Sequence, residues 1–351
     1  MVWPKVSIIW LNHNSSRFIN VVFNSLESVI NLDYPSDRYE LIVVDNGSTD
    51  GSFEKIKEFL ESRGSIKKKI IRLEKNLGFT GGNNIGYAAR DKESKYVLLL
   101  NNDAMLRSEG LKTLVEYLEK YNNVGSVQGV VLKYKSNLID TVGDFVDELL
   151  QSFVAGSGES YPWILKRPIY ITYADGCCAL YRVNALKRCC GESIFIDEFF
   201  GYGDDNVLGL MLWNIGYASI AIKYVVAEHF RGFTFGRASN LSQYLILRNR
   251  IALAQISNSR YKSVIMAQLL RWSVFSFRWG MGKKYVGKVI ARGLKFGEFL
   301  KRKGLFIDLY KAVLIKIDPT HIPLLFSTRK IVRKYYKEWF IKNLDKLQLD
   351  E

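Results

Sequence analysis

The sequence predicts an α/β fold: a Rossmann-like, mainly parallel sheet flanked by helices, followed by a basic helical region at the C-terminal end. Three observations lead to this prediction. Short apolar runs rich in β-branched residues alternate with helix-like stretches through residue 100. This alternation is typical of a parallel sheet with crossover helices. Beyond about residue 236 the alternation stops, the chain reads as helical, and basic residues far outnumber acidic ones.

Each element of the first hundred residues has its own signal. Four short, almost uninterrupted apolar runs predict buried strands: they are Val6–Leu11, Leu41–Val44, Ile70–Leu73 and Tyr96–Leu100. Helices are predicted between and after these strands, mostly behind a capping or glycine signal: they are Phe18–Asn31, Ser52–Arg63, Asn83–Lys92 and Gly110–Tyr121. The third helix is thus expected to begin after Gly81-Gly82. Further along, the glycine-containing segment Val154–Trp163 is expected to be a mobile loop.

Polar clusters follow the predicted strands: Asn12–Ser16, Asp45–Gly51, Asn76–Asn84 and Asn101–Asp103. Sheets of this kind bind ligands beyond the carboxyl ends of their strands, so we expect a nucleotide at this edge. A dinucleotide-binding dehydrogenase would need a G-x-G-x-x-G turn directly after the first strand. That turn, Asn12–Ser16, contains no glycine, which argues against a dehydrogenase.

Composition limits the protein class further. The 351 residues, 48% hydrophobic and 24% charged, fit a chain that buries a core and exclude a wholly disordered or collagen-like protein. The longest uncharged run, Asn206–Ile222, has 17 residues and two glycines, so no membrane-spanning helix is expected. The N-terminal residues show no secretion signal.

The net charge of +15 is unevenly distributed. Residues 1–229 carry 25 Lys and Arg against 28 Asp and Glu, a difference of −3, whereas residues 230–351 carry 25 against 7, a difference of +18. The two parts are therefore expected to face different partners. A basic surface of this kind suits nucleic acid, anionic lipid or phosphorylated substrates.

Seven motifs occur in a fixed order. They are VSIIWLNHNS, LIVVDNGSTDGS, NLGFTGGNNIG, LLLNNDA, DGCCALYRVNAL, FIDEFFGYGDDNVLGLMLWNIGY and AEHFRG. With these motifs, residues 5–250, including the LILRNR segment, resemble the inverting nucleotide-sugar glycosyltransferases of family 2. These enzymes have the GT-A fold. The subgroup that is most similar contains rhamnosyl- and galactofuranosyltransferases acting on lipid-linked glycans.

The resemblance implies a donor site around Asp45, which would accept a hydrogen bond from the base. A carboxylate can pair with the N3–H of uracil or thymine, or with guanine, and the subgroup favours UDP or dTDP. Asp45 could instead only shape an Asx-turn. The other residues implied at this site are His13, Asn14, Asn76, Gly82, Asn83, Asn84 and Asn102. Many relatives have Ala-Arg-Asn at positions 82–84, so the Arg that would neutralise the diphosphate is missing.

A metal site is implied by Asp103, at the place of the family's D-x-D-like motif, and by His229, which matches a further ligand in several relatives. Hard oxygen ligands favour Mg²⁺ or Mn²⁺, and an imidazole favours Mn²⁺. A lone His is also often structural.

Asp204 and Asp205 match the acid pair whose second member is the family's general base. Adjacent acids in an apolar setting raise each other's pKa, which suits proton abstraction. The alternative is an acid pair that merely stabilises a helix N-terminus. Asp175 matches a turn near the acceptor and the donor sugar. A third acid of many relatives is replaced here by Val207.

In the C-terminal region, Lys284–Arg302 reads as an amphipathic helix with Lys284, Lys288, Arg292 and Lys295 on one side. It suits docking on an anionic membrane surface, whereas the alternative is a solvated helix packed on the catalytic domain. No nucleic acid is expected, because no RNA-binding motif accompanies the charge.

These observations combine into one expectation. Residues 1–235 form a GT-A catalytic domain, with a nucleotide-sugar half at 1–103 and an acceptor half at 104–235, and residues 236–351 form the basic helical region. The protein is expected to be a metal-dependent inverting glycosyltransferase acting on a glycan or lipid-linked saccharide, in the cytoplasm and peripheral to the inner face of the cell membrane. The alternatives are a nucleotidyltransferase of similar fold and a membrane-docked protein that binds nucleotide sugars but is catalytically impaired.

Overall fold

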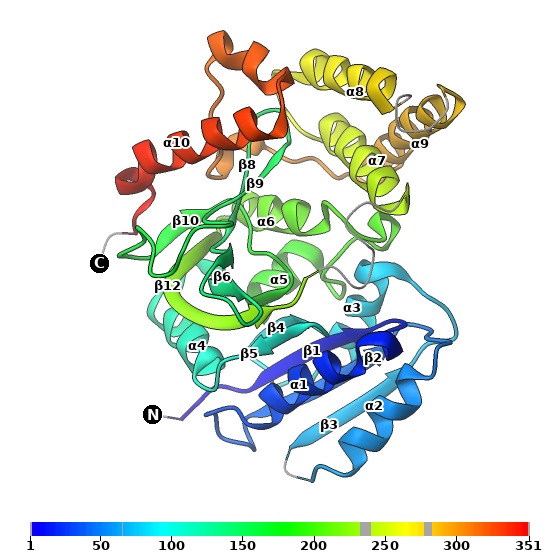
Figure 1. Ribbon diagram of the computed structural model, residues 1–351, viewed down its shortest axis with the longest axis vertical. Helices are drawn as coiled ribbons and strands as arrows, with labels where there is room; N and C mark the ends of the chain where they lie inside the picture. The colour runs from blue at the N-terminus through cyan, green and yellow to red at the C-terminus, as the bar shows by residue number, and fades with distance from the viewer. Residues whose placement is uncertain (1, 65, 232–239, 277–282, 350–351) are drawn as a thin grey trace.

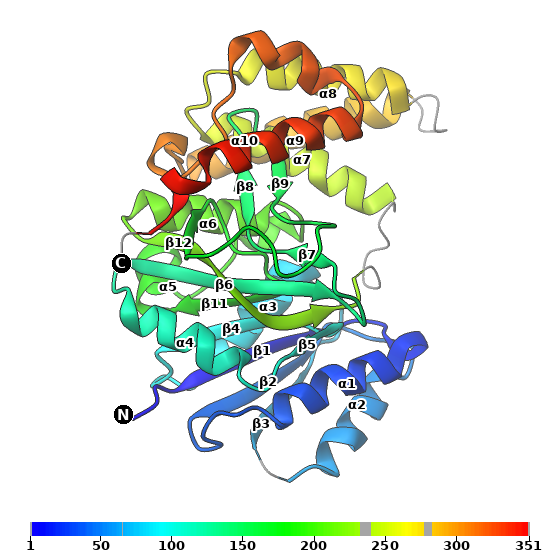
Figure 2. The same cartoon turned by 60° about the vertical axis from the view of Figure 1, so that its left-hand side comes forward.

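A twisted, mainly parallel sheet forms the centre of the protein (Figures 1 and 2). The computed structural model describes residues 2–64, 66–231, 240–276 and 283–349. The strands of the main sheet are β1 (Val6–Asn12), β2 (Tyr39–Asp45), β3 (Lys67–Arg72), β4 (Tyr96–Asn101), β5 (Ala104–Leu106), β6 (Val124–Lys133), β7 (Ile139–Thr141), β10 (Ile169–Ile171), β11 (Cys178–Arg182) and β12 (Ala218–His229). A separate hairpin consists of β8 (Asp144–Val146) and β9 (Ser152–Val154).

The strand order brings the ends of three early strands together. In the order β10-β12-β6-β11-β4-β1-β2-β3, β1 lies between β2 and β4 and is parallel to both. Asn12 pairs with Asp45, and Leu11 with Asn101, so the polar residues that follow these strands share one edge. The predicted parallel arrangement and the predicted edge are confirmed. Antiparallel β11 joins this parallel half to β6.

Ten α-helices of the described residues accompany the sheet. They are α1 (Ile19–Ile30), α2 (Ser52–Glu61), α3 (Gly78–Ala89), α4 (Gly110–Lys120), α5 (Val183–Cys190), α6 (Asp204–Asn214), α7 (Asn240–Ile256), α8 (Lys262–Ser276), α9 (Lys283–Arg302) and α10 (Arg329–Leu347). Helices α7 to α10 gather at the opposite end of the molecule from α1 and α2 (Figures 1 and 2).

The sheet separates two hydrophobic cores, because consecutive side chains of a strand point to opposite faces. Ile8 and Trp10 of β1 face the core that contains residues of α1, α2 and α4. Ile9 faces the other core, with residues of α5, α6 and the C-terminal helices. Strands β1, β2 and β4 are therefore buried on both faces, which explains their continuous apolar runs.

Helix α3 begins at Gly78, five residues before the predicted start, so the prediction of a start at Asn83 was wrong. The Gly81-Gly82 pair lies inside the helix because α3 approaches β1 closely. A Cβ added to Gly82 would lie 2.4 Å from Leu11, and one added to Gly86 would lie 2.4 Å from Ile9. These glycines serve helix–sheet contact and do not break the helix.

The predicted helix of the basic region exists as α9, but its apolar side is not free. Val289, Phe296 and Leu300 are buried. A Cβ added to Gly293 would lie 2.8 Å from Ile251 of α7, so the two helices touch closely. This side therefore packs on α7 of the same C-terminal region, and the choice between a membrane-docked helix and a helix packed on the catalytic domain stays a prediction.

Two further expectations concern the segment 154–163 and membrane-spanning helices. In the segment 154–163, the Trp163 ring stacks on Phe340 of α10 with 5.2 Å between ring centroids, and Ala155 is buried. Its mobility stays a prediction. Among the described residues, none of the helices has both the length and the apolar character needed to cross a membrane.

Candidate active site

Asn12, the last residue of β1, is the hub of the polar edge. Its buried amide nitrogen donates to Asp45 Oδ1 at 2.9 Å, and its amide oxygen accepts hydrogen bonds from Ser15 Oγ at 2.6 Å and from Asn102 Nδ2 at 3.1 Å. One amide thus ties together the residues that follow β1, β2 and β4. Asn12 was not among the predicted site residues, although it is the first residue of the polar cluster Asn12–Ser16.

Asp45 is fully buried. Its Oδ1 accepts the bond from Asn12, and its Oδ2 accepts one from the backbone N–H of Ser48 at 3.0 Å. This is the turn geometry that the sequence analysis gave as the alternative to base recognition. In this conformation the carboxylate presents no surface to a ligand, so its pairing with a base stays a prediction that requires the turn to open.

His13 and Asn14 follow β1 at the surface of the same edge. The Nδ1 of His13 lies 2.8 Å from the backbone oxygen of Asn46, and Asn14 Oδ1 accepts from the backbone N–H of Thr49 at 2.9 Å. Asn14 has a φ of +46°, which Asn tolerates better than most residues. Both side chains are partly or fully exposed, so both can meet a ligand.

The polar side chains of the segment Asn76–Asn84 bond to other groups of the protein. Asn76 Oδ1 accepts from Asn46 Nδ2 at 3.0 Å and from the backbone N–H of Gly78 at 2.7 Å. Asn83 Nδ2 donates to the backbone oxygen of Phe79 at 2.8 Å. Gly82 is buried inside α3. Binding of a donor by these residues stays a prediction, and the structure shows what they do without one: they order the start of α3.

Asn84 has a second connection. Its Nδ2 donates to the backbone oxygen of Phe195 at 2.8 Å and to Asp197 Oδ1 at 2.7 Å, and its Oδ1 accepts from the backbone N–H of Phe195 at 2.9 Å. Asn84 therefore links α3 to the loop that leads into the acid pair.

Asp103 and His229 lie side by side, as the resemblance implied. Asp103 Oδ1 is 3.0 Å from His229 Nε2, and Asp140 Oδ2 is 3.0 Å from His229 Nδ1. All three side chains are buried. Burial alone would lower the pKa of His229, but the hydrogen bonds and charges of Asp103 and Asp140 raise it to about 9.

Arg231 extends this series of hydrogen-bonded polar side chains, which we call the polar chain. Its Nε donates to Asp140 Oδ2 at 2.7 Å, and its Nη2 donates to Asp175 Oδ2 at 3.2 Å. Burial would raise the pKa of Asp140, but His229 and Arg231 hold it below its ordinary value. Asp175 occupies the turn before β11, so five charged or ionisable side chains connect the end of β4 to this turn.

The residues present suit a divalent cation. Asp103 offers one oxygen. His229 would offer its Nε2 once a bound cation displaces the proton that the raised pKa otherwise keeps there, and Asp140 backs the His as the outer carboxylate that metal-bound imidazoles commonly have. Among the described residues, no group of three His, Cys, Asp or Glu side chains forms a complete protein cage. Two protein ligands are nevertheless enough where phosphate oxygens and water complete the coordination of Mg²⁺ or Mn²⁺.

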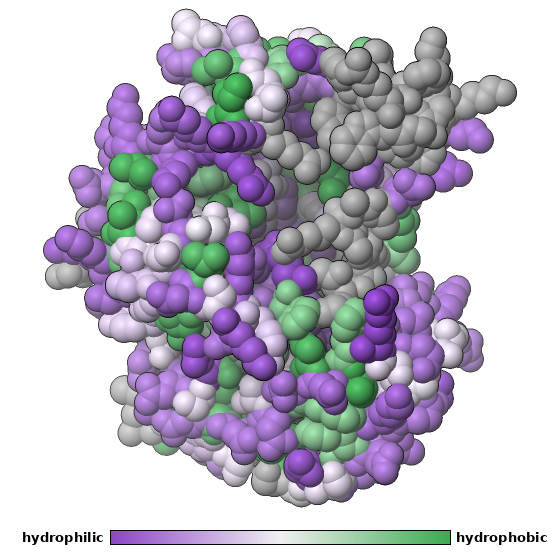
Figure 3. All heavy atoms as spheres, viewed as in Figure 1, coloured by the Kyte–Doolittle hydropathy of each residue, from purple (hydrophilic) through white to green (hydrophobic). Residues whose placement is uncertain are grey.

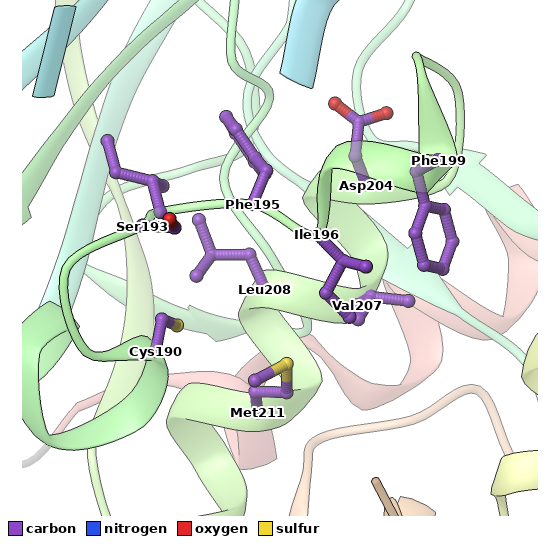
Figure 4. A pocket seen from close by; sticks show the side chains of 10 residues that line it. Cys190, Ser193, Phe195, Ile196, Phe199, Asp204, Val207, Leu208 and Met211 are labelled. Atoms are coloured by element: carbon purple, nitrogen blue, oxygen red, sulfur yellow. The ribbon is translucent and has the colours of Figure 1, made fainter. Parts of the chain in front are cut away.

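Asp204 and Asp205 open helix α6 behind Gly203. Asp204 is buried at one end of a small, partly open pocket of about 70 Å³, whose other side chains are mostly apolar, and its carboxylate points away from Met211 (Figure 4). Burial raises the pKa of Asp204 to about 7. The pKa of Asp205 lies well above its ordinary value because of burial and the charges of Asp204 and Asp175. The predicted direction of both shifts is confirmed.

Asp205 also faces the turn that carries Asp175. A Cβ added to Gly176 would lie 2.8 Å from Asp205 Oδ1, so a larger residue at this position would have to displace the carboxylate. That oxygen is buried without a hydrogen-bond partner in the described part of the chain. A buried, unpartnered carboxylate oxygen is poised to accept a proton.

The structure thus brings two of the predicted groups to one turn, Asp175-Gly176. Asp103 and His229 connect to this turn by the hydrogen bonds of Arg231. The acid pair lies against it at Gly176. Sequence reasoning missed Asp140 and Arg231. Arg231 stands two residues after His229 and could have been found there, whereas Asp140 is 89 residues from His229 and carries no local signal. The roles of these residues in binding and catalysis stay predictions.

Comparisons with known proteins agree with this architecture. A model of glycosyl transferase family 2 matches residues 7–190, slightly more than half of the chain. The poly(ribitol-phosphate) beta-N-acetylglucosaminyltransferase TarS of Staphylococcus aureus is 28% identical over 119 residues, 34% of this chain and 20% of TarS. The chain thus matches only about a fifth of the length of this relative.

Two more proteins are similar over a longer range. A dolichyl N-acetyl-alpha-D-glucosaminyl phosphate 3-beta-D-2,3-diacetamido-2,3-dideoxy-beta-D-glucuronosyltransferase of Methanococcus voltae is 21% identical over 229 residues, 64% of this chain and 66% of that protein. The crystal structure of GalNAc-T7 with UDP, GalNAc and Mn²⁺ has a TM-score of 0.62 at 14% identity, over 87% of this chain and 56% of that one. The predicted GT-A fold is confirmed, and the chain belongs to glycosyl transferase family 2.

Proposed function

We propose that this protein is a metal-dependent inverting glycosyltransferase. It transfers a sugar from a nucleoside-diphosphate sugar, with UDP or dTDP as the nucleotide, to a hydroxyl of a glycan or of a lipid-linked saccharide. The observation that carries this proposal is the continuous polar chain from Asp103 and His229, through Arg231 and Asp175, to the turn beside Asp205. It joins a site suited to a diphosphate to a site suited to proton abstraction.

The chemistry follows from these positions. Asp205 takes the proton of the acceptor hydroxyl, whose oxygen then forms a bond to C1 of the donor sugar while the bond from C1 to the diphosphate oxygen breaks on the opposite side. Asp204 keeps Asp205 basic through its neighbouring charge. Asp103 and His229 would hold a divalent cation, and such a cation neutralises charge on a departing diphosphate.

The choice of donor and metal rests on family membership and on the site. GalNAc-T7, which shares the fold, was crystallised with UDP and Mn²⁺. The His229 imidazole favours Mn²⁺ over Mg²⁺. The name of the Methanococcus voltae relative includes a dolichyl-linked sugar phosphate, which supports a lipid-linked acceptor.

A donor panel tests the proposal. The purified protein is incubated with UDP- and dTDP-sugars, with and without Mn²⁺, and products are separated by mass spectrometry. We expect release of nucleoside diphosphate that depends on Mn²⁺ and on an acceptor. Release of sugar 1-phosphate, with transfer of the nucleotidyl group to added pyrophosphate to give a nucleoside triphosphate, would instead identify a nucleotidyltransferase. Tight binding of a nucleotide sugar with neither transfer nor hydrolysis would identify a catalytically impaired binding protein.

We also propose that residues 236–351 attach the catalytic domain of residues 1–235 to the inner face of the cell membrane. Lys288, Arg292 and Lys295 are exposed on α9, while the apolar side of that helix faces α7; the side chain of Lys284 lies outside the described part. Hydrophilic side chains also cover the region of α10 in Figure 3. The attachment is therefore electrostatic, without insertion of α9.

Replacing Lys288, Arg292 and Lys295 by Glu should abolish co-sedimentation with vesicles that contain anionic lipid. The wild-type protein should bind such vesicles at low salt and leave them as the ionic strength rises, because salt screens exposed charges. Transfer to a soluble acceptor should be unchanged, whereas transfer to an acceptor in vesicles should fall.

The matched control replaces three exposed lysines of the sheet half, Lys57, Lys75 and Lys92, by Glu and makes the same change in net charge. It should still co-sediment. Equal loss of vesicle binding in both triple variants would show that only net charge matters, and absence of binding by the wild type at low salt would refute the membrane proposal.

A further inference from the structure

The loop that leads into the acid pair has an unusual backbone. It includes the short helix η2 (Asp197–Phe199) and ends at Gly203, directly before Asp204. Phe200 has a φ of +65° and Tyr202 a φ of +63°. Aromatic residues rarely adopt this left-handed conformation, so it persists only where surrounding contacts impose it. Because α6 starts here, any relaxation of the loop would move Asp204 and Asp205.

Asn249 of α7 supplies such contacts. Its Nδ2 lies 3.2 Å from the backbone oxygen of Phe199, 2.9 Å from that of Gly201 and 2.6 Å from that of Tyr202. Asn249 is only 2% exposed. A single buried amide group thus faces three carbonyls of this loop. Without it the carbonyls of Gly201 and Tyr202 would lose this donor, and that of Phe199 would lose one of two.

Arg248 fixes the orientation of that amide. Its Nε donates to Asn249 Oδ1 at 2.8 Å, so the NH₂ group of Asn249 must point to the loop. Its Nη2 donates to the backbone oxygens of Glu198 at 2.7 Å and Phe199 at 2.8 Å. Phe296 of α9 backs this arrangement, because its ring packs on the Phe199 ring with 5.1 Å between centroids and on the Arg248 guanidinium at 4.9 Å.

Helix α3 contacts the same loop from the other side. The backbone N–H of Phe79 donates to the oxygen of Phe200 at 2.7 Å, and Thr80 Oγ1 donates to that of Asp197 at 2.9 Å. Asn84 adds the bonds described above. The loop is therefore clamped between the nucleotide-binding half and a helix of the C-terminal region.

We infer that Arg248 and Asn249 are positioning residues that set the acid pair in its place for the transfer reaction. The inference rests on the proposed function, because it gives Asp205 the role of base. It also gives the C-terminal helical region a part in catalysis besides membrane attachment: α7 carries the clamp and α9 supports it. The LILRNR segment, which the donor and metal sites do not use, has its role here.

The substitution Asn249→Leu keeps the approximate volume and removes the amide. We expect kcat to fall about 10- to 100-fold, since a small displacement of a catalytic group costs this much. The KM for the donor and the affinity for nucleoside diphosphate should stay within about threefold, because the donor contacts lie in other elements. Gln255→Leu is the control: this amide of α7 donates to the backbone oxygen of Leu294 on α9 and does not touch the loop. It should leave kcat within about twofold.

The pH profile separates positioning from general destabilisation. Asp205 faces Asp204 on α6, Asp175 and Asp144, and Arg231 bonds to Asp175. In Asn249→Leu the pair becomes more hydrated, so the acidic limb of the kcat profile should move to lower pH. In Gln255→Leu it should not move. If Asn249→Leu does not fold, Arg248→Gln serves instead. It removes a donor from two loop carbonyls and leaves the Asn249 amide in place, so we expect a smaller fall in kcat.

Hydrogen–deuterium exchange gives a readout that does not depend on activity. Amides of residues 195–205 should exchange faster in Asn249→Leu than in the wild type or in Gln255→Leu. Wild-type kcat in Asn249→Leu, or unchanged exchange in this loop, would overturn the inference. A wild-type protein that transfers no sugar would refute the proposed function instead, and the exchange experiment would still decide whether Asn249 clamps the loop.

Discussion

Asp205→Asn should lower the turnover of sugar transfer by at least about 10²-fold, the usual contribution of a positioned general base. Asn has nearly the same shape as Asp but cannot accept the proton of the acceptor hydroxyl. Binding of nucleoside diphosphate should be unchanged, because Asp205 opens α6 and takes no part in the hydrogen bonds that Asn12 makes at the polar edge. Steady-state kinetics with calorimetry of donor binding measures both effects.

The pH dependence of the wild type belongs to the same prediction. A base acts in its deprotonated form, so activity should be present above its pKa and be lost as the pH falls through it. Burial and like charge raise the pKa values of the pair, that of Asp204 to about 7. Because the pKa of the base Asp205 lies well above its ordinary value, the acidic limb should lie well above pH 4.

Asp204→Asn is the informative comparison. It removes the neighbouring charge, so it should cost less turnover than Asp205→Asn and shift the acidic limb to lower pH. Glu58→Gln, which alters an exposed carboxylate on α2, should behave as the wild type. If Asp205→Asn kept turnover within a few-fold of wild type while Asp204→Asn lost it, the two roles would have to be exchanged.

Asp103→Ala should remove the metal-dependent part of nucleoside diphosphate binding and, with it, transfer activity. Asp103 is the anionic member of the Asp103–His229 pair, and a hard divalent cation depends most on such a ligand. His229→Ala should weaken binding less, because the imidazole is a neutral ligand. Calorimetric titration with UDP in the presence and absence of Mn²⁺ measures the metal-dependent part directly.

Asp140→Asn tests the outer partner of this site. Asp140 backs His229 without being a predicted ligand, and such outer partners typically change metal affinity by about 10- to 100-fold. The expected order of loss is therefore Asp103→Ala first, then His229→Ala and Asp140→Asn. Equal affinity for UDP in Asp103→Ala and wild type, with Mn²⁺ present, would mean that other residues hold the diphosphate.

Sequence alone determined the first half of the fold. Strands β1, β2 and β4 were predictable because a strand buried on both faces must be apolar at nearly every position, and such runs stand out between polar turns. The prediction of a buried strand at Ile70–Leu73 was wrong in burial and start, because β3 is the edge strand Lys67–Arg72 and none of its residues is buried. Their parallel order placed Asn12, Asp45 and Asn101 at one edge before any coordinates were known. The acid pair and the Asp103–His229 pair were predictable through the ordered motifs, since each motif carries its own local signal.

Tertiary packing decided three features that local sequence signals do not report: the start of α3, the orientation of Asp45 and the element that covers α9. The Gly81-Gly82 pair usually marks a helix boundary, but both glycines lie inside α3, where Gly82 allows close contact with Leu11 of β1. Asp45 turned inward because Asn12, on another strand, offered it a hydrogen bond. The periodicity of α9 showed that one side is apolar, but only the position of α7 showed what covers that side.

The same reason explains the residues that sequence reasoning missed. Asp140 meets His229, and Asn249 meets the loop before Asp204, across 89 and about 50 residues of chain. A single sequence reports local periodicity and turn chemistry, whereas a hydrogen bond between distant residues depends on the path of the whole chain. The sequence by itself therefore determined which elements form and which chemistry they carry, and the tertiary structure decided which buried polar groups satisfy one another.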